Sequence, residues 1–157
     1  MNRIEYIDGD ATQPKGEENK IIVHVCNDIG GWGRGFVLAI SKKWKAPEKA
    51  YRDWYISQDN FELGEVQFVQ VENTLWVANL IGQHKIKKNE EGHPPIRYAA
   101  IKEGIEKVAQ KSKELNASVH MPRIGCGLAG GKWEYIEPIL EENLIKNRIK
   151  TVVYDFK

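Results

Sequence analysis

The chain has 157 residues, is 41% hydrophobic and 29% charged, and carries a formal net charge of +1 at pH 7. This length and composition predict one domain over residues 1–157 with its own hydrophobic core. The balanced charge argues against a general nucleic-acid-binding surface, which usually shows a basic stripe. No apolar run is long enough to cross a membrane, and the N-terminal residues lack the hydrophobic segment of a signal peptide.

In chain order, the first half predicts two strands, two helices and a hairpin. Near-continuous apolar runs indicate strands covered on both faces, alternation indicates half-covered strands, and proline favours a first helical turn. The predicted elements are a strand over residues 3–7, a strand over 21–26, a helix over 36–44, a helix over 47–54, and paired antiparallel strands over 64–71 and 75–81.

The second half begins with a long loop and then alternates helices with strands. The predicted elements are a loop over residues 82–95, a helix over 97–115, a strand over 119–124, a helix over 133–145 and a strand over 151–154. Strands that alternate with helices, together with one hairpin, predict a mixed sheet between helix layers. The expected fold class is therefore α/β, as a three-layer α/β/α sandwich.

The two cysteines, Cys26 and Cys126, lie far apart in the sequence. They fit reduced thiols in a cytoplasmic protein better than a disulfide framework. The cysteines and the four histidines show no metal-ligand spacing. We therefore expect a cytoplasmic protein with no metal and no cofactor.

Two glycine-rich segments, residues 30–35 and 125–131, each follow a predicted strand and precede a predicted helix. Glycine lets successive amide groups point into one concavity, and a helix N-terminus adds unpaired N–H donors and partial positive charge. One such loop indicates an anion site. Two of them on one small domain predict a ligand with two linked phosphates.

Two known phosphate motifs fit the second segment poorly. Gly125, Gly127 and Gly130 match G-x-G-x-x-G, and Asp155 ends the next predicted strand, but too few residues follow for a dinucleotide-binding sheet. A P-loop needs a lysine where Gly131 stands. The remaining alternative for each segment is a tight turn that lets a helix pack closely on the sheet.

Three segments together resemble the macro domain family. They are GDA at residues 9–11, HVCN at 24–27 leading into the first glycine segment, and MPRIGCGL at 121–128. The similarity is to the branch with terminal ADP-ribose glycohydrolases, DNA ADP-ribosyl antitoxins and the yeast-type ADP-ribose-1''-phosphate phosphatase. It extends over essentially the whole chain in the same order of elements.

The resemblance implies ADP-ribose as the ligand. Asp10 would accept a hydrogen bond from the adenine amino group, and an ionised carboxylate suits this because it only accepts. Tyr154 or Phe156 is expected either to flank the adenine or to pack in the core, and Trp32 either to cover the ligand or to contact a partner chain. The expected ligand-binding residues are Gly9, Asp10, Ala11, Gly31, Trp32, Gly33, Arg34, Gly35, Ile124, Gly125, Cys126, Gly127, Leu128, Ala129 and Gly130.

The chain departs from the glycohydrolase-type members, which carry a nucleophilic lysine and an assisting aspartate. Gln83 and Ala129 stand at those positions, so that covalent mechanism is expected to be absent. The candidate catalytic residues are Asn27, Asp28 and His84, with His84 favoured because histidine titrates near neutral pH.

Two functions remain open at this point. The first is hydrolysis of ADP-ribose-1''-phosphate or of an ADP-ribosyl ester by a bound water. The second is a non-catalytic ADP-ribose sensor. The expected partners are ADP-ribose or an ADP-ribosylated small molecule or protein, with nucleic acid only as an ADP-ribosylated substrate and no membrane.

Overall fold

The computed structural model describes residues 2–156 and contains a six-stranded sheet with helices on both faces. The strands are β1 (Glu5–Asp8), β2 (Asn19–Asn27), β3 (Val66–Glu72), β4 (Leu75–Gln83), β5 (Ala117–Met121) and β6 (Thr151–Asp155). The helices are α1 (Phe36–Lys43), α2 (Ala46–Ser57), α3 (Tyr98–Leu115) and α4 (Trp133–Leu140), and a π-helical turn, η1 (Glu141–Ile145), follows α4.

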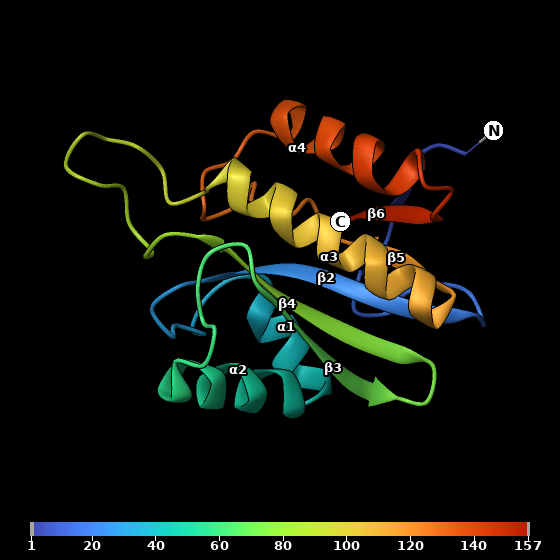
Figure 1. Cartoon of the computed structure of the whole chain (residues 1–157), viewed down its shortest axis with the longest axis horizontal. Helices are drawn as coiled ribbons and strands as arrows, with labels where there is room; N and C mark the ends of the chain where they lie inside the picture. Colours follow the sequence, from blue (N-terminus) through green and yellow to red (C-terminus); the bar gives the residue numbers. More distant parts are fainter. Residues whose placement is uncertain (1, 157) are drawn as a thin grey trace.

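The sheet is mixed, with strand order β1-β6-β5-β2-β4-β3. All paired neighbours are parallel except β3 and β4, which form the predicted antiparallel hairpin. Figure 1 shows α3 and α4 on one face of the sheet and α1 and α2 on the other. The predicted three-layer α/β/α sandwich is confirmed.

Strand β2 is buried on both faces, as its apolar run predicts. Ile21 and Val23 belong to the core under α3 and α4, whereas Ile22 and Cys26 belong to the core under α1 and α2. Successive side chains of a strand point to opposite faces, so this central strand needs apolar residues at nearly every position.

One predicted boundary in the C-terminal third is wrong, and one predicted helix changes its type along its length. Strand β5 ends at Met121 instead of residue 124, since Pro122 has no N–H to extend the ladder. Ile124 is buried in the following loop. The helix expected over residues 133–145 is α4 followed by η1, whose wider turn changes the hydrogen-bond pattern after Leu140.

The connections that follow β2 and β5 cross to opposite faces of the sheet, which makes the boundary between these strands a topological switch point. These neighbouring parallel strands lead to helices on opposite faces, α1 and α4 respectively. Ligand sites of open α/β sheets form at such switch points, beyond the carboxyl ends of the strands. Both glycine segments lie there.

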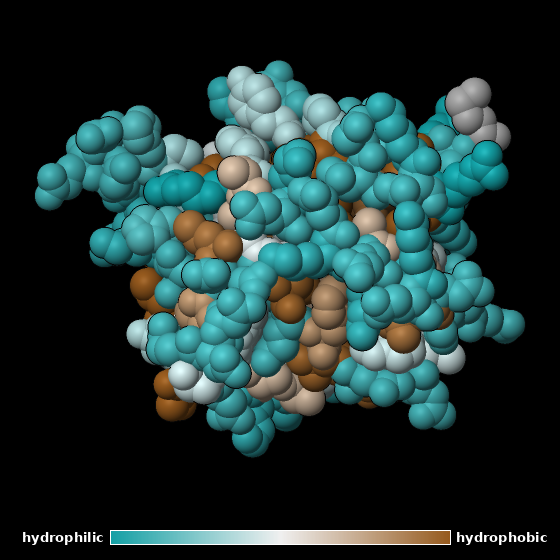
Figure 2. Space-filling model, viewed as in Figure 1, coloured by the Kyte–Doolittle hydropathy of each residue, from teal (hydrophilic) through white to brown (hydrophobic). Residues whose placement is uncertain are grey.

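The polarity of the face drawn in Figure 2 does not by itself mark a binding site. Figure 2 shows a mostly hydrophilic face on which hydrophobic side chains form small separate patches. No helix within residues 2–156 combines the length and apolar character needed to cross a bilayer.

Candidate functional site

The two glycine loops enclose a cleft at the switch point. Loop 1 (residues 28–35) connects β2 to α1, and loop 2 (residues 122–132) connects β5 to α4. A cavity of about 270 Å³ between them adjoins a second of about 410 Å³, and both are lined by Phe36 and Pro122. The second cavity is lined also by Gly9, Asp10, Ala11, Tyr154 and Phe156.

Gly33 of loop 1 and Gly127 of loop 2 are not required by the fold. Neither has a positive φ, and a Cβ built on either would meet no atom within 4 Å. Gly130 differs, because its φ is +76° and its Cβ would lie 2.7 Å from Cβ of Pro94. Side chains at Gly33 and Gly127 would occupy open space, so their absence leaves both backbones accessible to a ligand.

The start of α1 provides donors for an anion. Gly35 caps this helix with a φ of 83°, and within the described chain the helix has no side-chain cap and no acidic residue in its first turn. The first N–H groups of the helix are therefore open to an acceptor in the cleft. Arg34 lines the same cavity, and within residues 2–156 it forms no ion pair.

Asn27 holds loop 1 in shape. Its Oδ1 accepts hydrogen bonds from the amides of Ile29 (3.0 Å) and Gly31 (2.9 Å), while its Nδ2 donates to the Gly31 carbonyl (2.9 Å). The Tyr51 hydroxyl lies 2.6 Å from the Asn27 carbonyl oxygen and 2.8 Å from Oδ1. In this arrangement the Asn27 side chain bonds to the backbone of loop 1, although it was proposed from the sequence as a catalytic residue.

Asp10 has one carboxylate oxygen committed and one available. Its Oδ1 accepts hydrogen bonds from the Thr12 amide (2.8 Å) and hydroxyl (2.7 Å), which fixes the carboxylate at the rim of the cavity. No other group within residues 2–156 bonds to its Oδ2. Ala11 is buried beside it, and Tyr154, only 2% exposed, forms the floor beneath Gly9.

Asp28 and His84, predicted separately as catalytic residues, are brought together across two loops. His84 Nδ1 lies 2.7 Å from Asp28 Oδ2, and the Lys85 amide donates to Asp28 Oδ1 over 2.7 Å. Because a carboxylate only accepts, His84 Nδ1 carries the proton. Nε2 is then the acceptor, and no side chain or backbone group of the described residues bonds to it.

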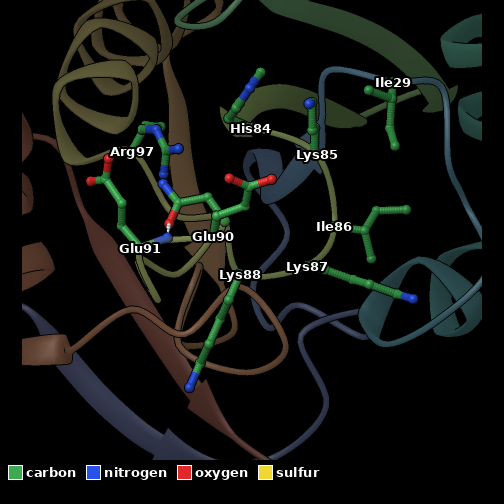
Figure 3. A pocket seen from close by; sticks show the side chains of 10 residues that line it. Ile29, His84, Lys85, Ile86, Lys87, Lys88, Glu90, Glu91 and Arg97 are labelled. Atoms are coloured by element: carbon green, nitrogen blue, oxygen red, sulfur yellow. Dashed lines mark hydrogen bonds between the residues drawn. The ribbon is translucent and has the colours of Figure 1, made fainter.

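A third cavity, of about 770 Å³, opens beside His84. Figure 3 shows His84 and Lys85 on one side of it, Ile29 and Ile86 on another, and the Glu90 carboxylate pointing into its middle. Gln83, the residue before His84, lines the cavity between the glycine loops. His84 therefore stands between the glycine-lined cleft and this larger space.

The proposed role of Trp32 as a cover or partner contact is wrong. Its side chain is 4% exposed, its indole nitrogen donates to Ser41 Oγ (2.7 Å), and its ring packs edge-on against His24. An indole can be buried when its N–H finds an acceptor, and this one lies in the core under α1 and α2. The Trp32 backbone is part of loop 1, but its side chain points into the core and away from the cleft.

His24 is the core histidine that its place in an apolar strand indicates. Its Nε2 lies 2.6 Å from Asn79 Oδ1, and burial lowers its pKa to about 4 despite that bond. Cys126 in loop 2 is only half-buried, yet burial still raises the pKa of its thiol. A neutral thiol is a poor nucleophile.

Loop 2 supplies both walls and support. Ile124, Gly125, Gly127, Leu128 and Ala129 line the cavity between the loops. The Ala129 carbonyl accepts the Ile96 amide (3.0 Å), and the Gly125 carbonyl accepts the Gly131 amide (2.7 Å). Phe36 and Pro122, which line both cavities, were not named as site residues from the sequence, although Phe36 directly follows the first glycine segment and Pro122 lies within the MPRIGCGL motif.

The described residues hold no group of three or more His, Cys, Asp or Glu side chains placed to bind a metal ion. The two adjoining cavities offer backbone amides and the Asp10 carboxylate, and the third cavity offers His84 with its Nδ1 bonded to Asp28.

Comparison with known proteins identifies the fold family. No protein-family model matches the sequence. The mouse chromodomain-helicase-DNA-binding protein 1-like is 32% identical over 98% of this chain, which spans only 18% of that protein. The ADP-ribose 1''-phosphate phosphatase of Lodderomyces elongisporus is 24% identical over 88% of this chain and 91% of its own length.

A solved structure gives the decisive match. The macrodomain protein from Streptomyces coelicolor is 51% identical, covers 98% of this chain and 99% of its own, and superposes with a TM-score of 0.88. The sequence identity extends over nearly all of both chains, and the TM-score shows that the two folds agree closely. The chain belongs to the macrodomain family.

Proposed function

We propose that this macrodomain binds ADP-ribose derivatives and hydrolyses the bond at C1'' of the distal ribose. The observation that carries the proposal is the Asp28–His84 pair, in which His84 lies beside the third cavity and directly follows Gln83 in the lining of the cavity between the glycine loops; Asp10 lines the cavity that adjoins it. The phosphatase name of the yeast relative supports the same ligand and reaction type.

In the proposed complex the adenine lies over Tyr154, with its amino group donating to the free oxygen of Asp10. The pyrophosphate lies between the backbones of Gly33 and Gly127 and the start of α1. Hydrogen bonds to a charged acceptor contribute roughly 1.5–3 kcal/mol each, so several amides together supply most of the affinity. The distal ribose then extends toward His84.

The chemistry follows from the tautomer of His84. The Asp28 carboxylate accepts a hydrogen bond from His84 Nδ1–H, and Nε2 accepts a proton from water as the water oxygen forms a bond to C1''. The bond from C1'' to the leaving oxygen breaks with its electron pair on that oxygen, which receives the proton that Nε2 took from water. Gln83 and Ala129 provide neither an amine nucleophile nor a carboxylate, so water is the nucleophile.

The larger cavity favours one class of leaving group. Its volume of about 770 Å³ lies in the range that encloses drug-sized molecules, far more than a single phosphate needs. We therefore favour an ADP-ribosyl ester on a protein side chain over ADP-ribose-1''-phosphate as substrate. A non-catalytic sensor remains the alternative if the chain binds ligand without turnover.

The test measures free ADP-ribose released from an ADP-ribosylated glutamate peptide and phosphate released from ADP-ribose-1''-phosphate, under multiple turnover. We expect ester hydrolysis that falls at least a hundredfold in Asp28→Asn and His84→Gln, with ADP-ribose affinity kept. His93→Gln is the matched control, because His93 lies on the same loop, is exposed and contacts Glu91 instead of Asp28. Tight binding without release of either product would leave only the sensor.

A further inference from the structure

A chain of hydrogen-bonded polar groups runs from the cavity lined by Asp10 and Tyr154, here the adenine-side cavity, to the amino ends of β5 and β2. The Tyr154 hydroxyl lies 2.7 Å from His120 Nδ1, and His120 Nε2 lies 2.7 Å from Ser118 Oγ. Ser118 Oγ in turn lies 2.9 Å from Glu18 Oε2. His120 and Ser118 are buried, and neither touches the ligand cleft.

The hydrogen bonds between Tyr154, His120, Ser118 and Glu18 all have the same direction: each group donates to the next one toward Glu18. The Glu18 carboxylate, which also pairs with Lys150, only accepts, so Ser118 donates to it. The Ser118 oxygen then accepts from His120 Nε2–H, which leaves Nδ1 as an acceptor for the Tyr154 hydroxyl. The Tyr154 oxygen finally accepts the Lys15 amide over 3.0 Å. Every polar atom along the path is satisfied in one tautomer only.

This tautomer requires a neutral His120. Burial lowers its pKa to about 4, since desolvation outweighs the charge of Glu18. Lys150 and Lys20 also act against protonation. Fully satisfied networks of this kind hold side chains in a single orientation.

The held side chain is the one beneath the ligand. Tyr154 is one of the residues that line the adenine-side cavity, and its ring Cδ2 lies 3.4 Å from the position that a Cβ on Gly9 would take. Its ring plane faces His120 at a tilt of 36° with centroids 5.7 Å apart. A ring free to rotate or shift would change the surface on which a flat base rests.

We propose that His120 is a positioning residue for base binding: through its bond to the Tyr154 hydroxyl it fixes the ring that forms the floor of the adenine site. The inference rests on the proposed ADP-ribose binding. Part of the adenine affinity would then depend on His120, which is buried beneath the cleft. Its Nε2 is held by Ser118, which in turn bonds to Glu18.

Two conservative variants separate this role from simple packing. His120→Asn places an amide near Nδ1 and retains a partner for Tyr154, whereas His120→Gln places it near Nε2 and retains the partner for Ser118. Ser112→Ala is the control, because it removes a buried hydroxyl bond (2.5 Å to the Ala117 carbonyl) that does not reach Tyr154. Thermal unfolding confirms that each variant is folded.

The experiment measures calorimetric affinity for ADP-ribose and ADP, affinity for inorganic pyrophosphate, and the Tyr154 ring resonances in ¹³C-tyrosine-labelled protein. We expect His120→Gln to lose roughly tenfold for the two adenine ligands, the scale of a weakened base–aromatic contact, and to shift the Tyr154 signals. Pyrophosphate affinity should not change. Ser112→Ala should resemble the wild type in all four measurements, and His120→Asn should resemble it in the three affinities.

Equal adenine affinities in wild type and His120→Gln, or equal losses in His120→Gln and Ser112→Ala, would overturn the positioning role. A parallel loss for pyrophosphate would overturn it too, since the defect would then be general. If the wild type binds neither adenine ligand, the proposed function itself fails, which is a different result from binding that ignores His120.

Discussion

Substituting alanine for Gly33 or Gly127 should abolish most ADP-ribose binding without harming the fold. A methyl group at either position points into open space, and neither backbone has the positive φ that would strain alanine. Folding stability should stay the same or rise by up to about 1 kcal/mol, because alanine restricts the unfolded chain. The added methyl group stands where a phosphate must approach the loop backbone.

The size of the effect follows from the bonds displaced. Losing one or two amide bonds to a charged phosphate costs roughly 1.5–3 kcal/mol each, or at least tenfold in Kd for each variant. Isothermal titration calorimetry measures the affinity and guanidinium denaturation measures the stability. Gly130→Ala is the contrasting control, because its φ of +76° and the nearby Pro94 predict a loss of stability of about 1–3 kcal/mol. Wild-type affinity in both Gly33→Ala and Gly127→Ala would refute the placement of the pyrophosphate.

Two further predictions concern the interior. His24 and His120 both have pKa values of about 4 in the native state against 6.5 when unfolded, so the unfolded chain binds more protons in that interval. Stability should be complete above pH 6.5 and fall toward pH 4 by up to roughly 3 kcal/mol per histidine, measured by urea denaturation; a flat profile would contradict their buried neutral state. Trp32→Phe removes the bond to Ser41 and should cost about 1–3 kcal/mol of stability with ADP-ribose affinity within twofold of wild type, whereas a tenfold affinity loss at unchanged stability would restore a covering role.

The fold was accessible from the sequence because its signals are local and strong. The apolar run in β2, the alternation in β3 and the helical spacing in α3 each reflect the face that the element buries. Boundaries were less accessible, as in the strand that stops at Pro122 and the helix that widens into η1. The first boundary depends on the missing backbone N–H of Pro122, and the change of helix type depends on packing after Leu140.

The residues proposed for the site could be named from the sequence, but their spatial arrangement could not. Asp10 and the glycine loops follow from motif and resemblance, and Asp28 and His84 were named from their residue type and position. Their 2.7 Å contact joins residues from loops after different strands, which no sequence spacing reveals. Trp32 was misjudged for the same reason, since its acceptor Ser41 lies on α1.

The most direct test of ADP-ribose binding between the two glycine loops is a crystal structure of the protein with ADP-ribose. We expect phosphate oxygens within hydrogen-bond distance of amides in both glycine loops, the adenine amino group at Asp10, and C1'' facing His84. Ligand bound elsewhere, or in this cleft with the adenine toward His84, would contradict it.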